Sequence, residues 1–217
     1  MDADAAQELR RMGLTAELLT TACVEGLCAA DSQHGPYEPA ISLGFQRWSK
    51  IVGALRAALE AEGWGKHDRF NAPRSVSPDK TVTIAAIGGD AWTGRPEGKP
   101  ANARARGRVL RGEVEANARC SPVSGIQTVL DLQGVPEADG GVESVGTQTW
   151  ILLYFWDGGA RVLRSELSLP SSCSNGIIDL WERRILLPEV PIDETVVVLR
   201  SDVGPSDDVD FEMTAVG

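Results

Sequence analysis

The sequence predicts an α+β fold in which N-terminal helices pack on a mainly antiparallel sheet of about five strands. Apolar residues recur at helical spacing through the first sixty residues, whereas β-branched and apolar runs bounded by glycine and proline dominate the second half. Helices first and strands later are typical of α+β folds rather than of alternating βαβ units. We expect one domain over residues 1–217, with a helical part at 1–65 and a sheet-forming part at 75–217 that carries a basic loop at 95–111.

Three helices are expected in the N-terminal part. The first spans Asp4–Met12, the second follows Thr15 as its N-cap, and the third runs from residue 41 or 42 to Glu62, where Gly63 ends it. Three consecutive helices also suggest a DNA-binding helix-turn-helix. The connection over residues 30–39 is too long for the tight turn of that motif, and the first two helices are acidic, so this interpretation is not favoured.

The middle of the chain is expected to contain one strand and one short helix. A β-branched run starts at Thr81 and ends in two glycines before Asp90, which predicts a strand. Glycine and proline alternate from Trp92 to Pro100, so this segment is expected to be a loop, and Arg106–Ala118 is compatible with a helix. The basic loop is therefore joined directly to the glycine turn at Asp90.

A β-hairpin is the clearest local feature of the C-terminal half. Thr149–Trp156 is apolar on both alternating faces, as expected of a central strand that is covered on both sides. The Asp157–Gly159 turn then leads into a return strand that Pro170 is expected to end. Further strands are expected at residues 177–187, 195–200 and 210–216.

The charge of the chain is large and unevenly distributed. The net charge is −10, which argues against non-specific binding of nucleic acid or of anionic membranes by the whole surface. Residues 1–40 carry a net charge of −5, residues 41–118 carry +5, and residues 119–217 carry −10. The middle of the chain is therefore a basic island in an acidic protein.

The sequence predicts a cytoplasmic protein that does not enter a membrane. No stretch approaches the roughly 20 apolar residues of a membrane span, and the first residues are acidic where a signal peptide is basic. Arginine outnumbers lysine by seventeen to four, which is typical of GC-rich bacterial genomes. The cysteines show neither metal-ligand spacing nor a disulfide framework, so reduced and buried thiols are expected at Cys23, Cys28, Cys120 and Cys173.

Four carboxylates are candidates for a metal site. Asp90 follows the predicted strand, and Glu113, Glu115 or Glu166 could join it, since a Mg²⁺ site needs one or two carboxylates and leaves room for water and substrate phosphate. Nucleases that use such a strand aspartate follow it with Glu-x-Lys. The lysine is missing after both Glu113 and Glu166, so surface or ion-paired carboxylates are the competing interpretation.

Glu166 is expected to lie beside apolar surface. A tight turn at Gly158–Gly159 would pair Ile151 with Glu166 and Leu153 with Arg164, which places these side chains on one face of the hairpin. A carboxylate there would be partly covered and would need Arg164, two residues away on the same face, as its partner. A structural ion pair is therefore favoured over a catalytic acid.

The basic loop is the most unusual feature of the sequence. Its six cations accompany a single acid, Glu97, and the planar fork of arginine suits phosphate or carboxylate. One interpretation is a flexible arm that orders on an anion-rich partner such as nucleic acid. The other, favoured by the flanking acidic segments, is an arm that lies on the acidic half of its own chain or of a neighbouring subunit. Trp92 is expected to fold onto the core, and the candidate anion- or partner-binding residues are Trp92, Arg95, Lys99, Arg104, Arg106, Arg108 and Arg111.

The leading functional hypothesis is a non-catalytic binding or subunit module of a larger bacterial or phage assembly that docks through charged surfaces. It rests on the lack of catalytic signatures in the sequence and on the segregation of charge. The first alternative is a Mg²⁺-dependent nuclease-like enzyme that uses Asp90 with Glu113, Glu115 or Glu166. The second is nucleic-acid binding through the arginine-rich arm. A protein partner or a homo-oligomer is expected, with no cofactor except Mg²⁺ under the first alternative.

Overall fold

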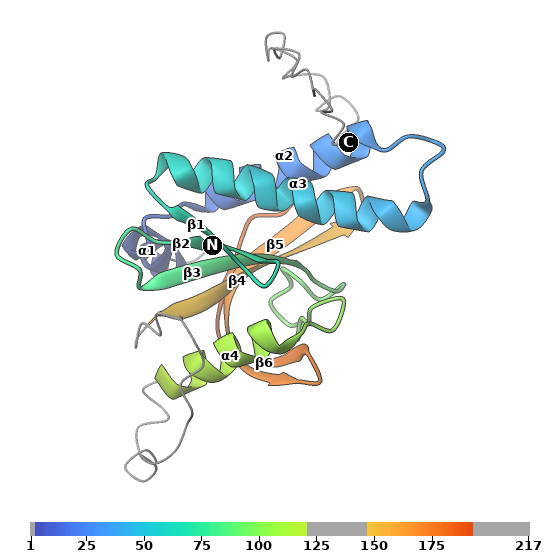
Figure 1. The fold of residues 1–217 in the computed structure, drawn as a ribbon. Helices are drawn as coiled ribbons and strands as arrows, with labels where there is room; N and C mark the ends of the chain where they lie inside the picture. Colours follow the sequence, from blue (N-terminus) through green and yellow to red (C-terminus); the bar gives the residue numbers. More distant parts are fainter. Residues whose placement is uncertain (1–2, 121–146, 193–217) are drawn as a thin grey trace, which may run out of the picture.

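In the computed structural model, which describes residues 3–120 and 147–192, three helices precede the sheet and a fourth lies in the connection between two of its strands (Figure 1). The expected α+β class is confirmed, because helices precede a mainly antiparallel sheet. The helices are α1 (Ala3–Arg11), α2 (Ala16–Gln33), α3 (Ala40–Ala61) and α4 (Arg108–Cys120). The strands are β1 (Gly65–Arg69), β2 (Ala72–Val76), β3 (Val82–Gly88), β4 (Gln148–Asp157), β5 (Val162–Ser174), β6 (Ile177–Leu186) and β7 (Val190–Pro191).

The N-terminal helices begin and end close to the positions expected from the sequence. The Leu18 N–H donates a hydrogen bond to the Thr15 hydroxyl at 3.0 Å, which confirms Thr15 as the N-cap of α2. Gly63 follows α3 in the left-handed region, with φ +83°, and so allows the chain to turn back towards the sheet. The two long helices cross closely, because a Cβ atom on Gly26 would come within 2.4 Å of the Cα atom of Ile51.

The sheet has the strand order β1-β2-β3-β4-β5-β6, and β7 pairs with β5. β3 and β4 are parallel, whereas the other neighbouring pairs are antiparallel. The described residues form seven strands rather than about five, because β1, β2 and β7 lack the hydrophobic runs that reveal the others. The β1–β2 hairpin turns at Phe70 and Asn71, which both have a positive φ, as a type I′ turn requires.

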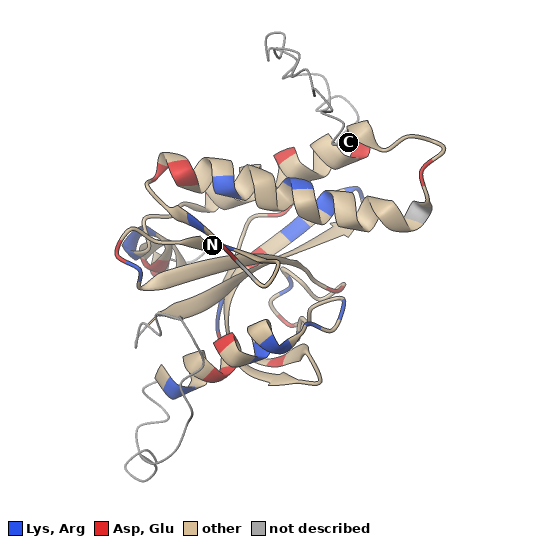
Figure 2. Ribbon diagram, viewed as in Figure 1, with Lys and Arg blue, Asp and Glu red and all other residues tan. Residues whose placement is uncertain are grey.

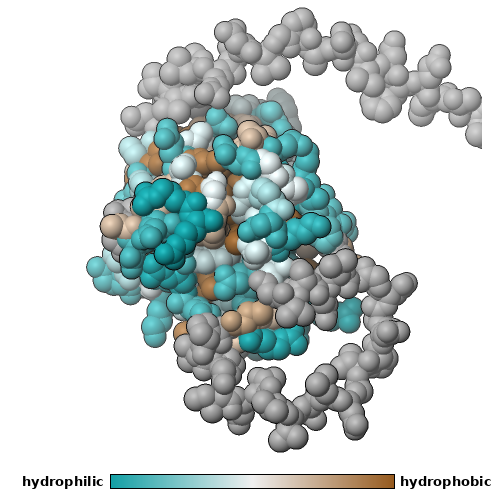
Figure 3. All heavy atoms as spheres, turned by 90° about the vertical axis from the view of Figure 1, so that its left-hand side faces the viewer, coloured by the Kyte–Doolittle hydropathy of each residue, from teal (hydrophilic) through white to brown (hydrophobic). Residues whose placement is uncertain are grey.

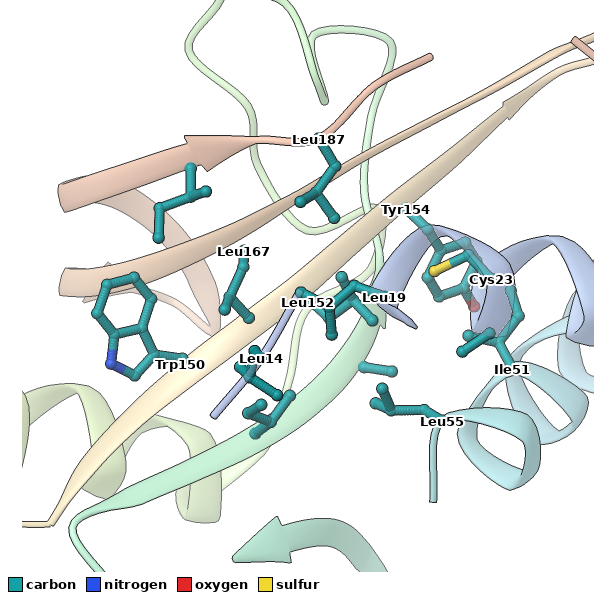
Figure 4. Packing of buried hydrophobic residues seen from close by; sticks show 14 of the residues in the cluster. Leu14, Leu19, Cys23, Ile51, Leu55, Trp150, Leu152, Tyr154, Leu167 and Leu187 are labelled. Atoms are coloured by element: carbon teal, nitrogen blue, oxygen red, sulfur yellow. The ribbon is translucent and has the colours of Figure 1, made fainter. Parts of the chain in front are cut away.

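Helices cover both faces of the sheet. α1, α2 and α3 pack on one face, where Leu152 and Tyr154 of β4 lie in one cluster with Cys23 of α2 and Ile51 of α3 (Figure 4). α4 packs on the opposite face, in a second cluster with residues of β3, β4 and β6. β3 and most of β4 are therefore buried on both sides, in agreement with their continuous apolar sequences.

The β4–β5 hairpin forms, but its register differs from the expected one by two residues. Trp156 lies opposite Leu163 rather than Arg161, and Leu153 lies opposite Glu166. The loop is longer than a two-residue turn because the Asp157 side chain accepts a hydrogen bond from the Ala160 N–H and Arg161 adopts a positive φ of +54°. A shift of two residues keeps each side chain on its face, so Glu166 still shares a face with Leu153.

The expectation that Pro170 ends the return strand is wrong, since β5 continues to Ser174. The β5–β6 register shifts at Leu169/Pro170 and again beyond it, so the ladder accommodates the proline through bulges. The Asn117 side chain of α4 donates hydrogen bonds to the Pro170 carbonyl at 3.1 Å and to the Thr149 carbonyl at 2.8 Å. α4 is thereby fastened to both β4 and β5. The strands expected at 195–200 and 210–216 lie outside the described residues.

The structure also bears on the membrane and on the cysteines. Within residues 3–120 and 147–192, no single helix is long and apolar enough to cross a membrane, and α1 with α2 meets that criterion only as a pair bent by 80°. The surface that faces left in Figure 1 is mainly hydrophilic, with hydrophobic residues in small patches (Figure 3).

Cys23 is buried as expected, Cys28 and Cys173 are half-buried, and Cys120 is exposed, so burial is confirmed for only one of the four free thiols.

Candidate functional site

A cleft lies outside the carboxyl ends of the parallel strands β3 and β4, the edge at which ligands bind in sheets with parallel strands. It consists of a cavity of about 710 Å³ and a neighbouring cavity of about 440 Å³. Both are lined by Trp48 of α3 and by Arg106, so the two cavities adjoin. The other lining residues fall within 44–48, 70–74, 86–89, 103–110 and 154–156.

The chain leaves β3 through a loop, residues 89–107, that forms one wall of the cleft and is called here the β3–α4 loop. It turns sharply at its start, where a Cβ atom on Gly89 would come within 2.1 Å of the Thr93 hydroxyl oxygen. Its central part is held by Asn102, which is buried, and whose amide donates to the Gly176 carbonyl at 2.9 Å and accepts from the Ile178 N–H at 2.7 Å. The Arg106 N–H also donates to the Gly176 carbonyl, at 2.9 Å.

Backbone groups and one amide thus fasten the β3–α4 loop to the β5–β6 hairpin of the same chain. The cationic side chains of the loop take no part in these hydrogen bonds. Nothing in the sequence identifies Asn102, because a single asparagine in an arginine-rich loop fits many turns equally well. Asn102 holds the loop through hydrogen bonds to the β5–β6 hairpin, which is more than seventy residues away in the chain.

The six cations of the basic loop divide into two groups. Arg104, Arg106 and Arg108, called here the cleft arginines, line the cleft. Arg95, Lys99 and Arg111, called here the outer cations, are exposed and do not line it. Among the described residues, no ion pair joins any of the six to a carboxylate. Figure 2 shows basic residues at the start of α4 and in the loop before it.

Arg106 has the most unusual environment of the cleft arginines. It is half-buried, and its Nε atom is buried without a hydrogen-bond partner among the described residues. Burial is the main cause that lowers its pKa; the nearby Tyr154 hydroxyl raises the pKa, and the positive charges of Arg74 and Arg104 lower it further. The guanidinium groups of this wall therefore repel one another, and an anion in the cleft would relieve that repulsion.

Two further arginines of the cleft are already paired. Arg74 of β2 forms a bidentate ion pair with Glu113 of α4, at 2.7 and 2.9 Å. Arg47 of α3 forms another with Asp31 of α2, at 2.7 and 3.0 Å. No Asp or Glu is among the described residues that line the two cavities. The uncompensated charge of the cleft therefore comes from the cleft arginines.

Aromatic side chains stand at the rim of the cleft. Phe45 of α3 lines the smaller cavity and is 66% exposed, whereas Phe70, in the β1–β2 turn, lines the larger cavity and is 75% exposed. Trp48 lines both cavities and donates a hydrogen bond from Nε1 to the Ala86 carbonyl at 3.2 Å. Its ring centroid is 5.5 Å from that of Phe45. The sequence does not mark these aromatics as a site, because Phe45 and Trp48 lie on α3, Phe70 lies in the β1–β2 turn, and none belongs to a local motif.

The candidate carboxylates of a metal site have separate structural roles. Asp90 accepts a hydrogen bond from the Trp92 N–H at 3.0 Å and so shapes the turn after β3. Glu113 pairs with Arg74, Glu115 is exposed on α4, and Glu166 is fully buried in β5. In the part of the chain that the structure describes, no group of three or more His, Cys, Asp or Glu is placed to hold a metal ion.

Glu166 does form the expected structural ion pair, but with a different arginine. Arg184 of β6 donates to its carboxylate at 2.5 Å and also to the carbonyls of Gly98 and Arg95. The expected partner, Arg164, instead lies 5.1 Å from the centroid of the Phe155 ring and donates to the Ala91 carbonyl at 3.3 Å. The sequence could not indicate Arg184, because cross-strand neighbours depend on how β6 pairs with β5.

Trp92 does not fold onto the core as expected. Its side chain is 54% exposed, and it lies against Gly98, where a Cβ atom would come within 2.9 Å of the Trp92 carbonyl oxygen and of its Cβ atom. Trp92 is absent from the described residues that line the cleft.

Searches of the chain against protein-family models, curated proteins and solved structures return no significant match.

Proposed function

We propose that this protein is a non-catalytic binding protein whose cleft takes a phosphate-bearing ligand on Arg104, Arg106 and Arg108. The observation that carries the proposal is that three arginines of one loop line a cleft whose described walls contain no carboxylate. Arginine presents a planar fork of N–H donors that matches phosphate oxygens, and a partly desolvated guanidinium gains most from such a partner. The cleft also lies where ligands approach the carboxyl ends of parallel strands.

The chemistry of the walls favours binding over catalysis. The described residues that line the cleft include no His, Cys, Asp or Glu, which are the usual side chains for proton transfer and for nucleophilic attack at neutral pH. The carboxylates that the sequence suggested for a Mg²⁺ site instead shape a turn, form ion pairs or face solvent. The residue types that line the cleft therefore favour recognition of an anion by fixed cations over catalysis.

Isothermal titration calorimetry with inorganic tripolyphosphate tests this function. We expect saturable binding that weakens as salt is added, because the interaction is ionic. Replacing the cleft arginines together, Arg104→Gln, Arg106→Gln and Arg108→Gln, should lower the affinity at least about tenfold, since hydrogen bonds between charged groups contribute about 1.5–3 kcal/mol each. The matched control replaces the outer cations, with Arg95→Gln, Lys99→Gln and Arg111→Gln, and removes the same charge.

Two results would contradict the proposal. Equal losses in the two triple variants would show that the net charge of the loop matters and that the cleft does not. Release of inorganic phosphate from tripolyphosphate by the purified protein would contradict its non-catalytic part. Thermal unfolding of both variants checks that they are folded, and exposure of the outer cations leads us to expect little change for the control.

A second candidate function, a subunit role in a larger assembly, has support from the start of α3. Tyr37 and Ile41 are 99% and 75% exposed, and Ile41 lies one helical turn before the exposed Phe45. Exposed apolar residues on one helix face are typical of protein contacts. Light scattering of the purified protein tests self-association, and Ile41→Ser should dissociate an oligomer formed there while Leu180→Ser, at an exposed position on β6, leaves it intact. A monomer in both cases would remove the homo-oligomer from this candidate.

A further inference from the structure

Resting on the proposed function, we infer that the phosphate-bearing ligand is a single-stranded nucleic acid whose backbone follows the cleft arginines and whose bases stack on Phe45 and Phe70. Proteins that bind single strands combine a positive groove with aromatic side chains that receive the bases. Both components occur in this cleft, and they come from three separate parts of the chain.

The shape of the cleft fits a strand that crosses it. The two cavities adjoin at Trp48 and Arg106, so together they form a groove, and one exposed phenylalanine lines each of its two parts. The cleft arginines line both parts of this groove, from the β3–α4 loop and the first turn of α4. A single inorganic anion would occupy one position beside Arg106. A polymer would contact all three arginines and both aromatic side chains.

The two phenylalanines are fixed in exposed positions. Phe45 is held beside Trp48, whose indole is hydrogen-bonded to the backbone of β3. Phe70 stands in a tight hairpin turn with a φ of +52°, a conformation that glycine and asparagine adopt more easily than a bulky aromatic residue. Both rings are exposed and line the groove, where a base could stack on them.

A single strand suits this groove better than a duplex. Its bases are unpaired and can turn into a cavity, whereas a duplex keeps their flat faces inside the stack. The net charge of −10 opposes a broad contact with a polyanion, so binding is confined to a positive groove. Such contacts lose affinity steeply as salt rises.

Fluorescence anisotropy with labelled oligonucleotides tests the inference. The probes are oligo(dT) and oligo(U) of about ten nucleotides, a length within the site sizes of single-strand binding folds, and an abasic strand of the same length. Phe45→Ala and Phe70→Ala should each weaken binding of the base-containing probes by about tenfold, since base–aromatic stacking contributes about 1–3 kcal/mol. Neither substitution should weaken binding of the abasic strand, which keeps the phosphates and lacks the bases.

Matched controls separate the groove from general charge and from general aromatic exposure. Tyr37→Ala removes an exposed aromatic side chain that does not line the cleft and should leave all affinities unchanged. The outer-cation triple variant should retain most of the affinity, because these exposed side chains do not line the groove and salt weakens the effect of charges that do not contact the ligand. The cleft-arginine triple variant should lose affinity for every probe, abasic strand included.

The outcomes distinguish this inference from the function on which it rests. Binding of tripolyphosphate without tighter binding of oligo(dT) or oligo(U) than of the abasic strand would overturn the single-strand ligand and keep the phosphate site. Tighter binding of a duplex than of either single strand would overturn it as well. Binding of none of these anions would overturn both the inference and the proposed function. Loss of affinity for oligo(dT) and oligo(U) in both phenylalanine variants supports the inference, and a comparison of oligo(dU) with oligo(U), which differ only in the sugar, then identifies the sugar that the groove accepts.

Discussion

The two halves of the β3–α4 loop differ in charge and are held in different ways: residues 89–100 carry two bases and two acids, whereas residues 101–107 carry two arginines and no acid. Residues 89–100 lie over the buried Glu166, whose carboxylate accepts hydrogen bonds from the Gly94 N–H and from Arg184. Arg184 also binds carbonyls in this half of the loop. Residues 101–107 are held by Asn102 and by backbone hydrogen bonds, and their arginines form no ion pair within the described residues.

The difference shows that the role of an arginine depends on whether a carboxylate lies within reach. Arg184 completes an internal ion pair with Glu166 and therefore stabilises the folded state. Arg104 and Arg106 line a cleft that supplies no carboxylate from its described residues, so they remain available for a ligand. Loss of the Glu166–Arg184 ion pair, which holds the first half, should accordingly lower stability, and substitution of the arginines in the second half should lower affinity.

The largest effect is expected from Glu166→Gln. It leaves the largely buried Arg184 without its counter-charge, and breaking such a pair by removing one partner costs about 3–5 kcal/mol. Urea denaturation measures the free energy of unfolding. Glu97→Gln, at an exposed position of the same loop half, is the control and should change it by less than about 0.5 kcal/mol. Equal stabilities for the two variants would show that the buried pair does not hold the loop.

Asn102 and Asn117 provide a matched pair of buried amides. Each binds backbone groups of two other segments, so Asn102→Ala and Asn117→Ala should each lower the free energy of unfolding by about 1–3 kcal/mol. Only Asn102→Ala should also weaken tripolyphosphate binding, because Asn102 fixes the loop that carries Arg104 and Arg106. Denaturation and calorimetry on both variants check this. Loss of binding in the Asn117 variant at a temperature where it is folded would contradict the distinction.

Alkaline pH separates core stability from the charges of the loop, since arginine stays protonated far above neutral pH. Burial raises the pKa of the Cys23 thiol from 9.0 to about 12, so the folded state keeps the neutral thiol. The resulting stability is complete below pH 9 and is lost as the pH rises from 9 towards 12, by at most about 1.4 kcal/mol per pH unit.

Cys23→Ala should therefore flatten the loss of stability above pH 9, relative to its own value at pH 7. Urea denaturation across this range measures the slope. The exposed Cys120→Ala serves as the control and should keep the slope of the unmodified protein. Identical slopes in all three proteins would show that the Cys23 thiol is not protected from ionisation in the fold.

The smallest stability effect is expected from Arg106→Gln. Removing a half-buried charge with no hydrogen-bond partner at Nε should leave the free energy of unfolding unchanged or raise it by up to about 1 kcal/mol. Affinity for tripolyphosphate should nevertheless fall. A destabilisation of more than about 1 kcal/mol would show that Arg106, like Arg184, stabilises the folded state and would contradict this prediction.

Much of the local structure follows from the sequence because its causes are local. Thr15 caps α2, Gly63 follows α3, and the apolar run at Thr149–Trp156 forms a strand covered on both faces. The expected helix at Arg106–Ala118 is present as α4, two residues later at each end. Hydrophobic periodicity and turn chemistry act over a few residues, so they can be read without knowing what packs against them.

Contacts between distant segments could not be derived in the same way. The polar β1–β2 hairpin has no hydrophobic alternation, and the continuation of β5 past Pro170 depends on bulges and on Asn117. The partner of Glu166 depends on the pairing of β6, which is a long-range event. The cleft itself joins residues from α3, the β1–β2 hairpin, the ends of β3 and β4, and the start of α4. Chain folding brings these segments together, because burial of both faces of the sheet fixes where each helix and loop can lie.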